Sequence, residues 1–334
     1  MNLRHCLRYL VLISSLLSSG VGFAAWYSDD QAIMGTKVSV TLWHLDGANA
    51  QAAIAEVMAD MRAVERQFSP YIVSSELAKL NQTAAKDAVK ISPELALLIK
   101  QSIDASAESG GAFDITYASL GWYYDYRKQI QPTAEQRKAL QPAINYRWLS
   151  FNEQQSTLKY LHKNVRIDLG GIAKGYATDR AIALLRSRGI KHASVSAGGD
   201  SKLLGDRKGR PWLIGIKHPR PAKKTDAVVL TLPLSDIAVS TSGDYERYFI
   251  DSQSGERVHH IINPRTGRSA NEVMSVTVLG PEGLATDPLS TSVFVLGVEE
   301  GLALVNRKPG LDCVIIDRKG QVHYSEGLVD PSAP

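Results

Sequence analysis

Cysteine is almost absent from this sequence, which contains only Cys6 and Cys313 among 334 residues. Cys6 precedes the apolar core of a predicted secretory signal, so it is not a lipid-modified cysteine at the cleavage site and would be removed with the signal. No internal disulfide can then form, and an exported chain of this length must rely on a hydrophobic core. Cys313 lies in the apolar run LDCVII and is predicted to be a buried core thiol.

Long hydrophobic runs are also scarce. At the N-terminus, Arg4 and Arg8 precede an apolar core over residues 10–17, followed by small residues that suit a cleavage site after Ala24. This pattern predicts a signal peptide of residues 1–24 and export to the periplasm. The apolar core is shorter than the roughly 20 residues that a membrane helix needs, so an uncleaved anchor is the less favoured alternative. No later stretch is expected to span a membrane.

The sequence has no large excess of charge of either sign. Its formal net charge is +4, and removal of Arg4 and Arg8 with the signal brings it closer to zero. The basic runs are short, which argues against nucleic acid or an anionic membrane surface as a partner. The sequence also lacks internal repeats, zinc-ligand spacing and the G-x-S-x-G nucleophile motif.

The remaining sequence interleaves predicted helices with many short strands. Residues 36–43 alternate as a strand, and residues 54–68 place apolar side chains on one helical face. Serine-capped helices are predicted at Ser74–Asn81 and after Ser92. The second half contains apolar stretches separated by turns, predicted as strands: HASVSAG, WLIGIKHP, AVVLTLPL, DIAVSTSG, RYFI, VHHIIN, SVTVLGP and a closing hairpin in IIDRKGQVHY. We predict one α/β or α+β domain over residues 25–334, with mixed sheets and flanking helices.

The most informative stretch is DLGGIAKGYATDRA, from Asp168 to Ala181. It follows NVRID, whose alternating pattern predicts a strand, and it continues into a helix that ends before Gly189. A strand–glycine–helix junction directs free backbone N–H groups and the positive end of a helix dipole to one point, where phosphate can bind. The alternative is a turn that needs glycine only for its backbone. Because Tyr176 follows Gly175, the stretch is not a P-loop, and the Rossmann spacing is absent too.

A candidate metal site lies in ATDPLSTS. Asp287 and Thr291 are four residues apart in a helix predicted from Pro288 onward, so both oxygens would lie on one helical face. Carboxylate and hydroxyl oxygens suit Mg²⁺ or Ca²⁺ and are poor ligands for zinc. The alternative interpretation makes Asp287 an N-cap residue and leaves Thr291 as a packing residue.

A candidate acid–base residue is His260, at the predicted end of a strand and just before the turn of HHIINPRTG. Histidine is the side chain whose ordinary pKa suits proton transfer near neutral pH, although a histidine beside a turn is more often structural. Its neighbour His259 is expected to face the other side of the strand. Glycine pairs and hydroxyls in SAGGD and TSGDYERYF supply two further close-approach turns.

Together these segments resemble the FAD:protein FMN transferase (ApbE) family. The resemblance covers nearly all of the chain after residue 24 and rests on an ordered set of motifs: MGT at Met34, FSPY ending at Tyr71, SSELAKLN, GAFDIT at Gly111, DLGGIAKGYATD, SAGGD, STSGDYERYF, HHIINPRTG and ATDPLSTS. It implies an ApbE-like fold related to the T-fold. It also implies Mg²⁺-dependent cleavage of FAD, with FMN attached through a phosphoester to a threonine or serine of a target protein and AMP released.

The resemblance also implies roles for individual residues of this sequence. It places FAD contacts at Met34, Tyr71, Ala112, Phe113, Asp114, Asp168, Lys174 and Ile261, with a core role as the alternative for Phe113. It places Mg²⁺ ligands at Gly171 (through its carbonyl oxygen), Asp287 and Thr291, and a catalytic role at His260. The implied partners are exported FMN-binding proteins of electron-transfer systems, with no nucleic acid and no stable membrane anchor.

The sequence departs from the family pattern in two places. Asn263 stands where the motif H-x-I-D-P-x-T-G has an acid, and we interpret it as a turn residue, because Asn and Asp serve turns alike. YASLGWYYDYR replaces the usual V-x-P-L-W pattern, so the contacts with the target protein or with the FAD rings are expected to differ. Two alternative functions stay open: a Mg²⁺-dependent FAD pyrophosphatase, and a non-catalytic periplasmic FAD-binding protein.

Overall fold

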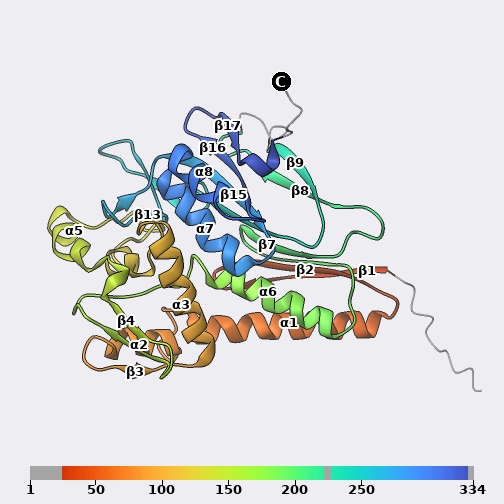
Figure 1. The fold of residues 1–334 in the computed structure, drawn as a ribbon, viewed down its shortest axis with the longest axis horizontal. Helices are drawn as coiled ribbons and strands as arrows, with labels where there is room; N and C mark the ends of the chain where they lie inside the picture. The colour runs from red at the N-terminus through yellow and green to blue at the C-terminus, as the bar shows by residue number, and fades with distance from the viewer. Residues whose placement is uncertain (1–24, 222–226, 330–334) are drawn as a thin grey trace, which may run out of the picture.

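A computed structural model of the chain describes residues 25–221 and 227–329. The predicted signal peptide therefore lies outside the described residues. An eight-stranded sheet runs through the molecule in the order β1-β2-β6-β7-β10-β15-β16-β17 (Figure 1). Its strands are β1 (Ala25–Ile33), β2 (Thr36–His44), β6 (Ala193–Ala197), β7 (Asp200–Leu204), β10 (Ala238–Gly243), β15 (Val273–Gly280), β16 (Asp312–Asp317) and β17 (Val322–Tyr324).

Four helices form a layer on one face of this sheet, in the same order as the strands that they cover. They are α1 (Gly47–Phe68), α6 (Ala173–Ser187), α7 (Gly283–Leu296) and α8 (Val298–Asn306). Helix α1 contacts β1 and β2, α6 contacts β6 and β7, α7 contacts β10 and β15, and α8 contacts β16. Each helix also contacts the next one in this order, so α6 and α7 lie side by side at the centre of the layer.

Smaller elements complete the fold. The hairpin of β8 (Trp212–Lys217) and β9 (Val228–Leu234) packs against the other face of the sheet near β16. A lobe at one end of the molecule (Figure 1) contains α2 (Glu76–Thr83), α3 (Pro93–Glu108), α4 (Ala118–Gly121), α5 (Ala134–Leu140), β3 (Val89–Lys90), β4 (Leu149–Asn152) and β5 (Thr157–Tyr160). Two short hairpins pair β11 (Tyr248–Ile250) with β12 (Arg257–His259) and β13 (Ile262–Asn263) with β14 (Arg268–Ser269).

The predicted class of interleaved helices and strands is confirmed, and the structure makes it more specific. Every strand pair among the described residues is antiparallel, so this is an α+β arrangement in which the sheets are not mixed in strand direction. Alternation along β16 explains why both sheet faces are covered. Cys313 and Ile315 face α7 and α8, and Val314 and Ile316 face the β8–β9 hairpin. The prediction of Cys313 as a buried core thiol is confirmed, because its exposed fraction is 0%.

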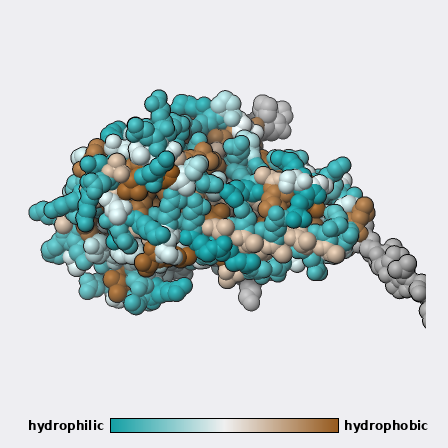
Figure 2. Space-filling view, turned by 90° about the horizontal axis from the view of Figure 1, so that it is seen from below, coloured by the Kyte–Doolittle hydropathy of each residue, from teal (hydrophilic) through white to brown (hydrophobic). Residues whose placement is uncertain are grey.

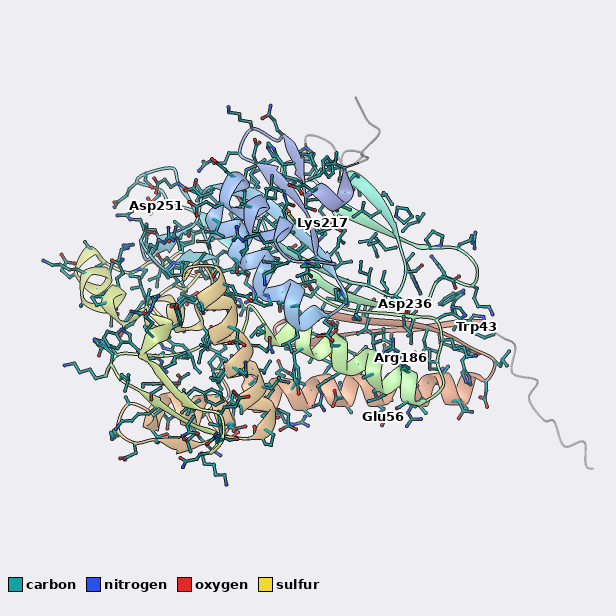
Figure 3. The ribbon with its side chains drawn as sticks, in the orientation of Figure 1. Trp43, Glu56, Arg186, Lys217, Asp236 and Asp251 are labelled. Atoms are coloured by element: carbon teal, nitrogen blue, oxygen red, sulfur yellow. The ribbon has the colours of Figure 1, made fainter. Side chains whose placement is uncertain are left out.

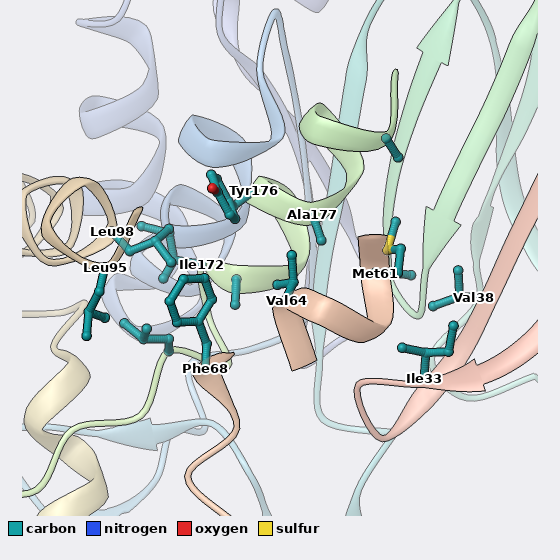
Figure 4. Packing of buried hydrophobic residues seen from close by; sticks show 14 of the residues in the cluster. Ile33, Val38, Met61, Val64, Phe68, Leu95, Leu98, Ile172, Tyr176 and Ala177 are labelled. Atoms are coloured by element: carbon teal, nitrogen blue, oxygen red, sulfur yellow. The ribbon is translucent and has the colours of Figure 1, made fainter. Parts of the chain in front are cut away.

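The largest hydrophobic core holds the start of α6 in place. All six residues predicted as the apolar face of α1 are buried: Ile54, Val57, Met58, Met61, Val64 and Phe68. At the end of α1, the ring of Phe68 packs edge-on against Tyr176 of α6, with 6.3 Å between ring centroids. Leu95 and Leu98 of α3 close the same cluster from the other side (Figure 4). This packing fixes the first turn of α6 between the sheet layer and the lobe.

Three local predictions were wrong. NVRID forms no strand, because Asn81 bonds the backbone of Ile167 through its side chain and Asp168 N–H donates to the carbonyl of Ile115. VHHIIN is two short strands, since the backbone turns away at His260 and pairs with a different strand afterwards. Helix α7 begins at Gly283 and includes Pro288, so Asp287 is not its N-cap residue.

One stretch contradicts the expectation that no later segment is long enough to cross a membrane. Gly283–Asn306 is sufficiently long and apolar by length and composition alone, and 61% of its apolar window is buried inside the protein. Gly297, at φ +84°, divides it into α7 and α8, which cover the central sheet. This burial is typical of core helices. The face seen in Figure 2 is mostly hydrophilic, with hydrophobic residues in small groups.

Helices α6 and α7 approach each other through Gly175 and Gly283. A Cβ atom on Gly175 would lie 2.0 Å from the carbonyl oxygen of Gly283 and 2.8 Å from Cβ of Asp287. We expect Gly175→Ala to lower the free energy of unfolding by about 3 kcal/mol or more, because backbone atoms cannot move aside as a flexible side chain can. Urea unfolding measures this, with Ala183→Ser on the exposed side of α6 as control. Equal midpoints for Gly175→Ala and wild type would contradict the prediction.

Candidate active site

Helices α6 and α7 each supply a carboxylate that accepts hydrogen bonds from N–H groups in the first turn of the other helix. Ile172, at the N-cap of α6, provides no side-chain hydrogen bond to the helix. Instead, Gly175 N–H donates to Oδ2 of Asp287 on α7 at 3.0 Å. In return, Asp179 of α6 accepts hydrogen bonds from the N–H groups of Gly283 and Leu284, at 2.9 and 2.8 Å. Carboxylates near helix N-termini are stabilised by the helix dipole, so the glycine-rich junction and Asp287 form one electrostatic unit.

Lys174 lies between two buried carboxylates. Its Nζ donates to Asp200 Oδ2 and lies 3.4 Å from Asp287 Oδ1, and each acid is 2% exposed. Burial raises the pKa of Asp287 to about 7, and the charge of Asp200 adds to this effect, while Lys174 and the N–H of Gly175 oppose it. Burial alone would lower the pKa of Lys174, but Asp200 and Asp287 outweigh it and raise that pKa. Two carboxylates share one ammonium here, so a cation added beside Asp287 would balance the remaining charge.

The three predicted metal ligands lie at the α6–α7 contact. A Cβ atom on Gly171 would lie 3.6 Å from Oγ1 of Thr291, and Asp287 is one helical turn before Thr291 on α7. No cluster of three or more His, Cys, Asp or Glu side chains that could hold a metal occurs in the described part of the chain. A cation here would therefore use one carboxylate together with hydroxyl and carbonyl oxygens, a hard-oxygen donor set that fits Mg²⁺.

Hydroxyl groups line the seam between β10 and α7. Oγ of Ser242 lies 2.8 Å from Oγ of Ser290 and 3.2 Å from Oγ1 of Thr291. One turn earlier on α7, Oγ of Ser240 lies 2.8 Å from Oγ1 of Thr286. These contacts hold the Thr291 side chain against the strand. The hydroxyls of TSGDYERYF were predicted only as part of a close-approach turn, so the contact between Ser242 and the predicted metal ligand Thr291 was missed.

His260 holds a neutral imidazole in a half-buried position. Its Nδ1 is buried and has no hydrogen-bond partner among the described residues, while its backbone N–H donates to the carbonyl of Arg247 at 3.2 Å. Burial lowers the pKa of His260 to about 3, and the charges of His259, Arg247 and Lys174 act in the same direction. At neutral pH the ring therefore carries no charge, and a nitrogen lone pair is available to accept a proton from a hydroxyl brought beside it.

The same burial makes stability depend on acid. In the unfolded chain, His260 titrates near its ordinary pKa of 6.5, whereas in the folded protein it titrates near 3. Between these values the unfolded state binds more protons, so this residue lowers the free energy of unfolding as the pH falls from 6.5 toward 3. We expect His260→Gln to remove at least about 1 kcal/mol of the loss in stability between pH 7 and pH 4. Urea unfolding at both pH values measures this, and parallel curves for variant and wild type would contradict it.

His259 has a structural role on the opposite side. Its side chain is buried, with Nε2 2.6 Å from the carbonyl oxygen of Ala270 and Nδ1 accepting from Ile261 N–H at 3.3 Å. Its predicted orientation away from His260 fits these separate surroundings. Asn263 is a turn residue, as interpreted from the sequence: its Oδ1 accepts from Arg265 N–H at 2.9 Å and its carbonyl accepts from two further N–H groups of the turn.

An exposed aromatic stack lies near the start of α6. The ring of Tyr71 is 73% exposed and stacks on Trp122, with 5.2 Å between centroids and 14° between planes. The guanidinium carbon of Arg166 lies 4.2 Å from the centroid of the same Trp122 ring. Trp122 belongs to the segment that departs from the family pattern, so this departure supplies the ring that supports Tyr71. Stacked rings of this kind present a flat, rigid surface to a flat ligand.

The other predicted FAD residues surround the same region but differ in accessibility. Asp168 is half-buried, and burial raises its pKa, while the N–H of Gly170 donates to its Oδ1 at 2.6 Å and opposes that rise. Met34 lies at φ +56° in the β1–β2 turn, with its N–H bonded to Glu65. Ala112 and Ile261 are buried in one common cluster beneath α7.

Phe113 and Asp114 have contacts within the fold. Phe113 is 3% exposed and belongs to the main core, where its ring would lie 3.1 Å from a Cβ atom on Gly171. The carboxylate of Asp114 accepts hydrogen bonds from both the N–H and the hydroxyl of Thr116 and from the N–H of Tyr146. These two residues therefore shape the loop beside Gly171, whatever further contact they make with a ligand.

Arg247, like Ser242, is a site residue that was not predicted from the sequence. Its Nη2 donates to the carbonyl of Gly35 at 3.0 Å, in the turn that carries Met34, and its own carbonyl accepts from His260. Its positive charge opposes the rise in the pKa values of Tyr71 and Asp168, so it lies among these predicted FAD residues. The motif TSGDYERYF contained the signal, because an arginine beside a glycine turn is a ready phosphate ligand.

Comparison with known proteins decides the family. The model of the ApbE family matches residues 34–315, which is most of the chain. The chain belongs to the ApbE family. It is similar to the FAD:protein FMN transferase of Treponema pallidum, with 30% identity over 91% of this chain and 88% of that protein. It is also similar to the FAD:protein FMN transferase of Vibrio cholerae, with 32% identity over 89% and 90% of the two chains.

Solved ApbE structures share the fold. The ApbE protein of Thermotoga maritima superposes with a TM-score of 0.82 and 32% identity, covering 91% of this chain and 98% of that one. The flavin transferase ApbE of Vibrio cholerae gives a TM-score of 0.81 with 29% identity and the same coverage. The predicted ApbE-like architecture is therefore confirmed.

Proposed function

We propose that this ApbE family member is an FAD:protein FMN transferase that requires Mg²⁺ and modifies exported proteins. The observation that carries the proposal is the α6–α7 contact, where Gly171, Asp287 and Thr291 meet beside the half-buried Lys174. The names of its relatives, FAD:protein FMN transferases, support the transfer of FMN from FAD to a protein. In the proposed reaction the acceptor is a threonine or serine of the target protein, and AMP leaves.

The residues at this contact fit a magnesium ion. Asp287 supplies a carboxylate, Thr291 a hydroxyl and Gly171 a backbone carbonyl, and the excess of buried negative charge favours a bound cation. A bound Mg²⁺ would neutralise the pyrophosphate and stabilise the charge that develops on the AMP leaving group. Lys174 keeps its proton because Asp200 and Asp287 raise its pKa, so it holds a positive charge beside the phosphates at neutral pH.

His260 would take the proton from the acceptor hydroxyl. The acceptor oxygen then forms a bond to the phosphorus of the FMN half of FAD, the bond from that phosphorus to the bridging oxygen breaks, and AMP carries that oxygen away. The neutral state of the buried imidazole favours this role over that of a general acid. Positioning and electrostatics supply most of the rate in a transfer of this kind.

Tyr71 would form one wall of the FAD site. Its exposed ring stacks on Trp122, and Arg166 packs against that same Trp122 ring. The outer face of Tyr71 is therefore rigid and available to a flat ring of FAD. We expect Tyr71→Ala to raise the Kd for FAD by about 10-fold, because stacking on an aromatic side chain contributes about 1–3 kcal/mol per base. Fluorescence titration of FAD measures this. Tyr324→Ala, at another exposed tyrosine on the distant β17, serves as control, and an equal Kd for Tyr71→Ala and wild type would contradict the stacking role.

The proposal includes a location. The predicted signal peptide, and the position of Cys6 before its apolar core, favour a periplasmic protein released from the membrane after cleavage at Ala24. Its targets would then be exported FMN-binding proteins of electron-transfer systems. Fractionation of cells that express the full chain, with mass spectrometry of the mature N-terminus, tests both the location and the cleavage site.

Product analysis tests the reaction. The mature protein is incubated with FAD and Mg²⁺, with and without an exported FMN-binding domain, and AMP, free FMN and protein-bound FMN are measured. A transferase releases AMP in step with protein-bound FMN. AMP released together with free FMN, whether or not acceptor is present, would instead establish a pyrophosphatase. Intact FAD in the presence of a domain that another ApbE transferase modifies would contradict both enzymes and support a binding protein.

A further inference from the structure

A cavity lies beside the β11–β12 hairpin. Its volume is about 650 Å³, and its lining residues include Ile250, Glu256, Arg257 and His259 of that hairpin. No residue that was predicted to bind FAD or metal lines it. Figure 3 labels Asp251, in the turn of this hairpin, in the upper left of the view, far from Arg186 near the C-terminal end of α6. This cavity has no role in the reaction as described so far.

Arginine dominates the cavity. Four arginines line it: Arg220, Arg257, Arg268 and Arg318. Arg220 is neutralised by Asp244, with Nη2 and Oδ2 2.5 Å apart. In the part of the chain that the structure describes, the other three form no ion pair with a carboxylate. Glu256, on the exposed side of the lining, is the remaining acid, so the cavity has an excess of positive charge.

Arg257 supplies a second, independent observation. Its Nη1 is buried and has no hydrogen-bond partner within the described ranges, although its guanidinium carbon lies 3.7 Å from the centroid of the Tyr248 ring. A buried donor on a charged group without a partner is costly, and an anion that accepts from it would remove that cost. Nη1 of Arg318 donates to the carbonyl of Asn271, which leaves further guanidinium donors for a ligand.

The cavity is linked to the proposed reaction centre through β12. This strand begins at Arg257, and its last residue, His259, lines the cavity. The next residue is His260, so the Cα atoms of the two histidines are about 3.8 Å apart, and the two side chains have different surroundings. A group bound among the arginines therefore lies a short distance from the residue that would take the proton of the acceptor hydroxyl.

We propose that this cavity is an anion-binding site that holds a carboxylate of the acceptor protein while its threonine or serine reaches His260. The inference rests on the proposed transferase function and identifies acidic acceptor segments as the preferred targets. Guanidinium groups recognise carboxylates through paired hydrogen bonds, and such charge complementarity selects a partner and fixes its register. FAD and Mg²⁺ bind elsewhere, so losing the cavity charge changes acceptor recognition alone.

The test compares the double variant Arg257→Gln/Arg318→Gln with wild type, using an exported FMN-binding domain as acceptor. We expect its KM for the acceptor to rise by about 10-fold, as for loss of a close charge pair, with the KM for FAD within about twofold of wild type. Because Arg257 packs on Tyr248, the single variant Arg318→Gln at an exposed position is measured too. Arg186→Gln, at an exposed arginine on α6, is the matched control and should change neither constant.

An acceptor that lacks its acidic side chains gives the second half of the test. Aspartate and glutamate residues within ten positions of the acceptor hydroxyl are changed to their amides, and the KM of this acceptor should be high and equal for wild type and double variant. An unchanged acceptor KM in the double variant overturns the proposal. If inorganic phosphate binds wild type but not the double variant, while both have the same acceptor KM, the cavity takes a small free anion instead. Absence of any transfer by wild type would refute the proposed function itself.

Discussion

Replacing Asp287 by asparagine is expected to lower the rate of FMN transfer by at least about 1000-fold. Asp287 is the only carboxylate among the three proposed magnesium ligands, and it also neutralises Lys174. Asparagine keeps the size of the side chain and an oxygen that can accept from the N–H of Gly175, so the cap between α6 and α7 is preserved. The measurement is the rate of AMP release as a function of Mg²⁺ concentration.

Asp200→Asn is the informative control for this prediction. Asp200 also binds Lys174 but is not a proposed magnesium ligand, so its variant should keep the Mg²⁺ dependence of wild type even if the maximal rate falls. If both variants lost the Mg²⁺ dependence equally, the loss would come from the changed surroundings of Lys174, with which both acids pair. Wild-type rates for Asp287→Asn would contradict the assignment of the metal site.

Replacing His260 by alanine should leave FAD binding within about twofold of wild type but lower the transfer rate by about 100- to 10,000-fold. The imidazole is neutral because burial lowers its pKa to about 3, and its Nδ1 has no hydrogen-bond partner in residues 25–221 and 227–329. Removing it therefore costs the proton acceptor without removing a hydrogen bond that supports the fold. Single-turnover transfer, started by mixing the FAD-loaded protein with acceptor, measures the chemical step separately from FAD binding.

The low pKa of His260 also fixes the pH dependence of the reaction. A base with a pKa of about 3 stays unprotonated throughout the range from pH 5 to pH 8, so the wild-type rate should not fall near pH 6.5 through protonation of His260. His323→Gln, on the edge strand β17, is the control and should transfer FMN at the wild-type rate. A transfer rate for His260→Ala equal to that of wild type would contradict the proton-acceptor role.

Periodicity and capping residues predicted the helices well. Ser75 and Ser92 cap α2 and α3 as expected from serine before a helical pattern, and the apolar face of α1 is buried from Ile54 to Phe68. Each of these features depends on residues within a few positions of one another. Gly189, at φ +76°, follows the end of α6 as its position in the sequence predicts.

The failures come from contacts between distant segments. NVRID has the alternation of a strand, yet Asn81 satisfies the backbone of Ile167, which removes the need for a partner strand. Asp287 looks like a cap for its own helix, but it caps α6 instead. Sequence alone does not show that α6 and α7 meet through two glycines, so this pairing could only be found in the structure.

The candidate site shows the same division. Asp287 and Thr291 were found by their spacing on one helix, whereas Lys174 was named through the family resemblance. Arg247 and Ser242 were missed as site residues, because their roles depend on how β10 and the following turn pack against Gly35 and α7. The arginine cavity was not foreseen either, since Arg220, Arg257 and Arg318 are widely separated in the sequence.

Flavin fluorescence on a denaturing gel tests the central claim most directly. The mature protein is incubated with FAD and Mg²⁺ and an exported FMN-binding domain, beside reactions that contain EDTA or an acceptor whose threonine is replaced by alanine. The account predicts a fluorescent acceptor band that appears only with Mg²⁺ and with the intact threonine. An acceptor that another ApbE transferase labels, but that stays dark with this protein while FAD remains intact or is hydrolysed to free FMN, would contradict it.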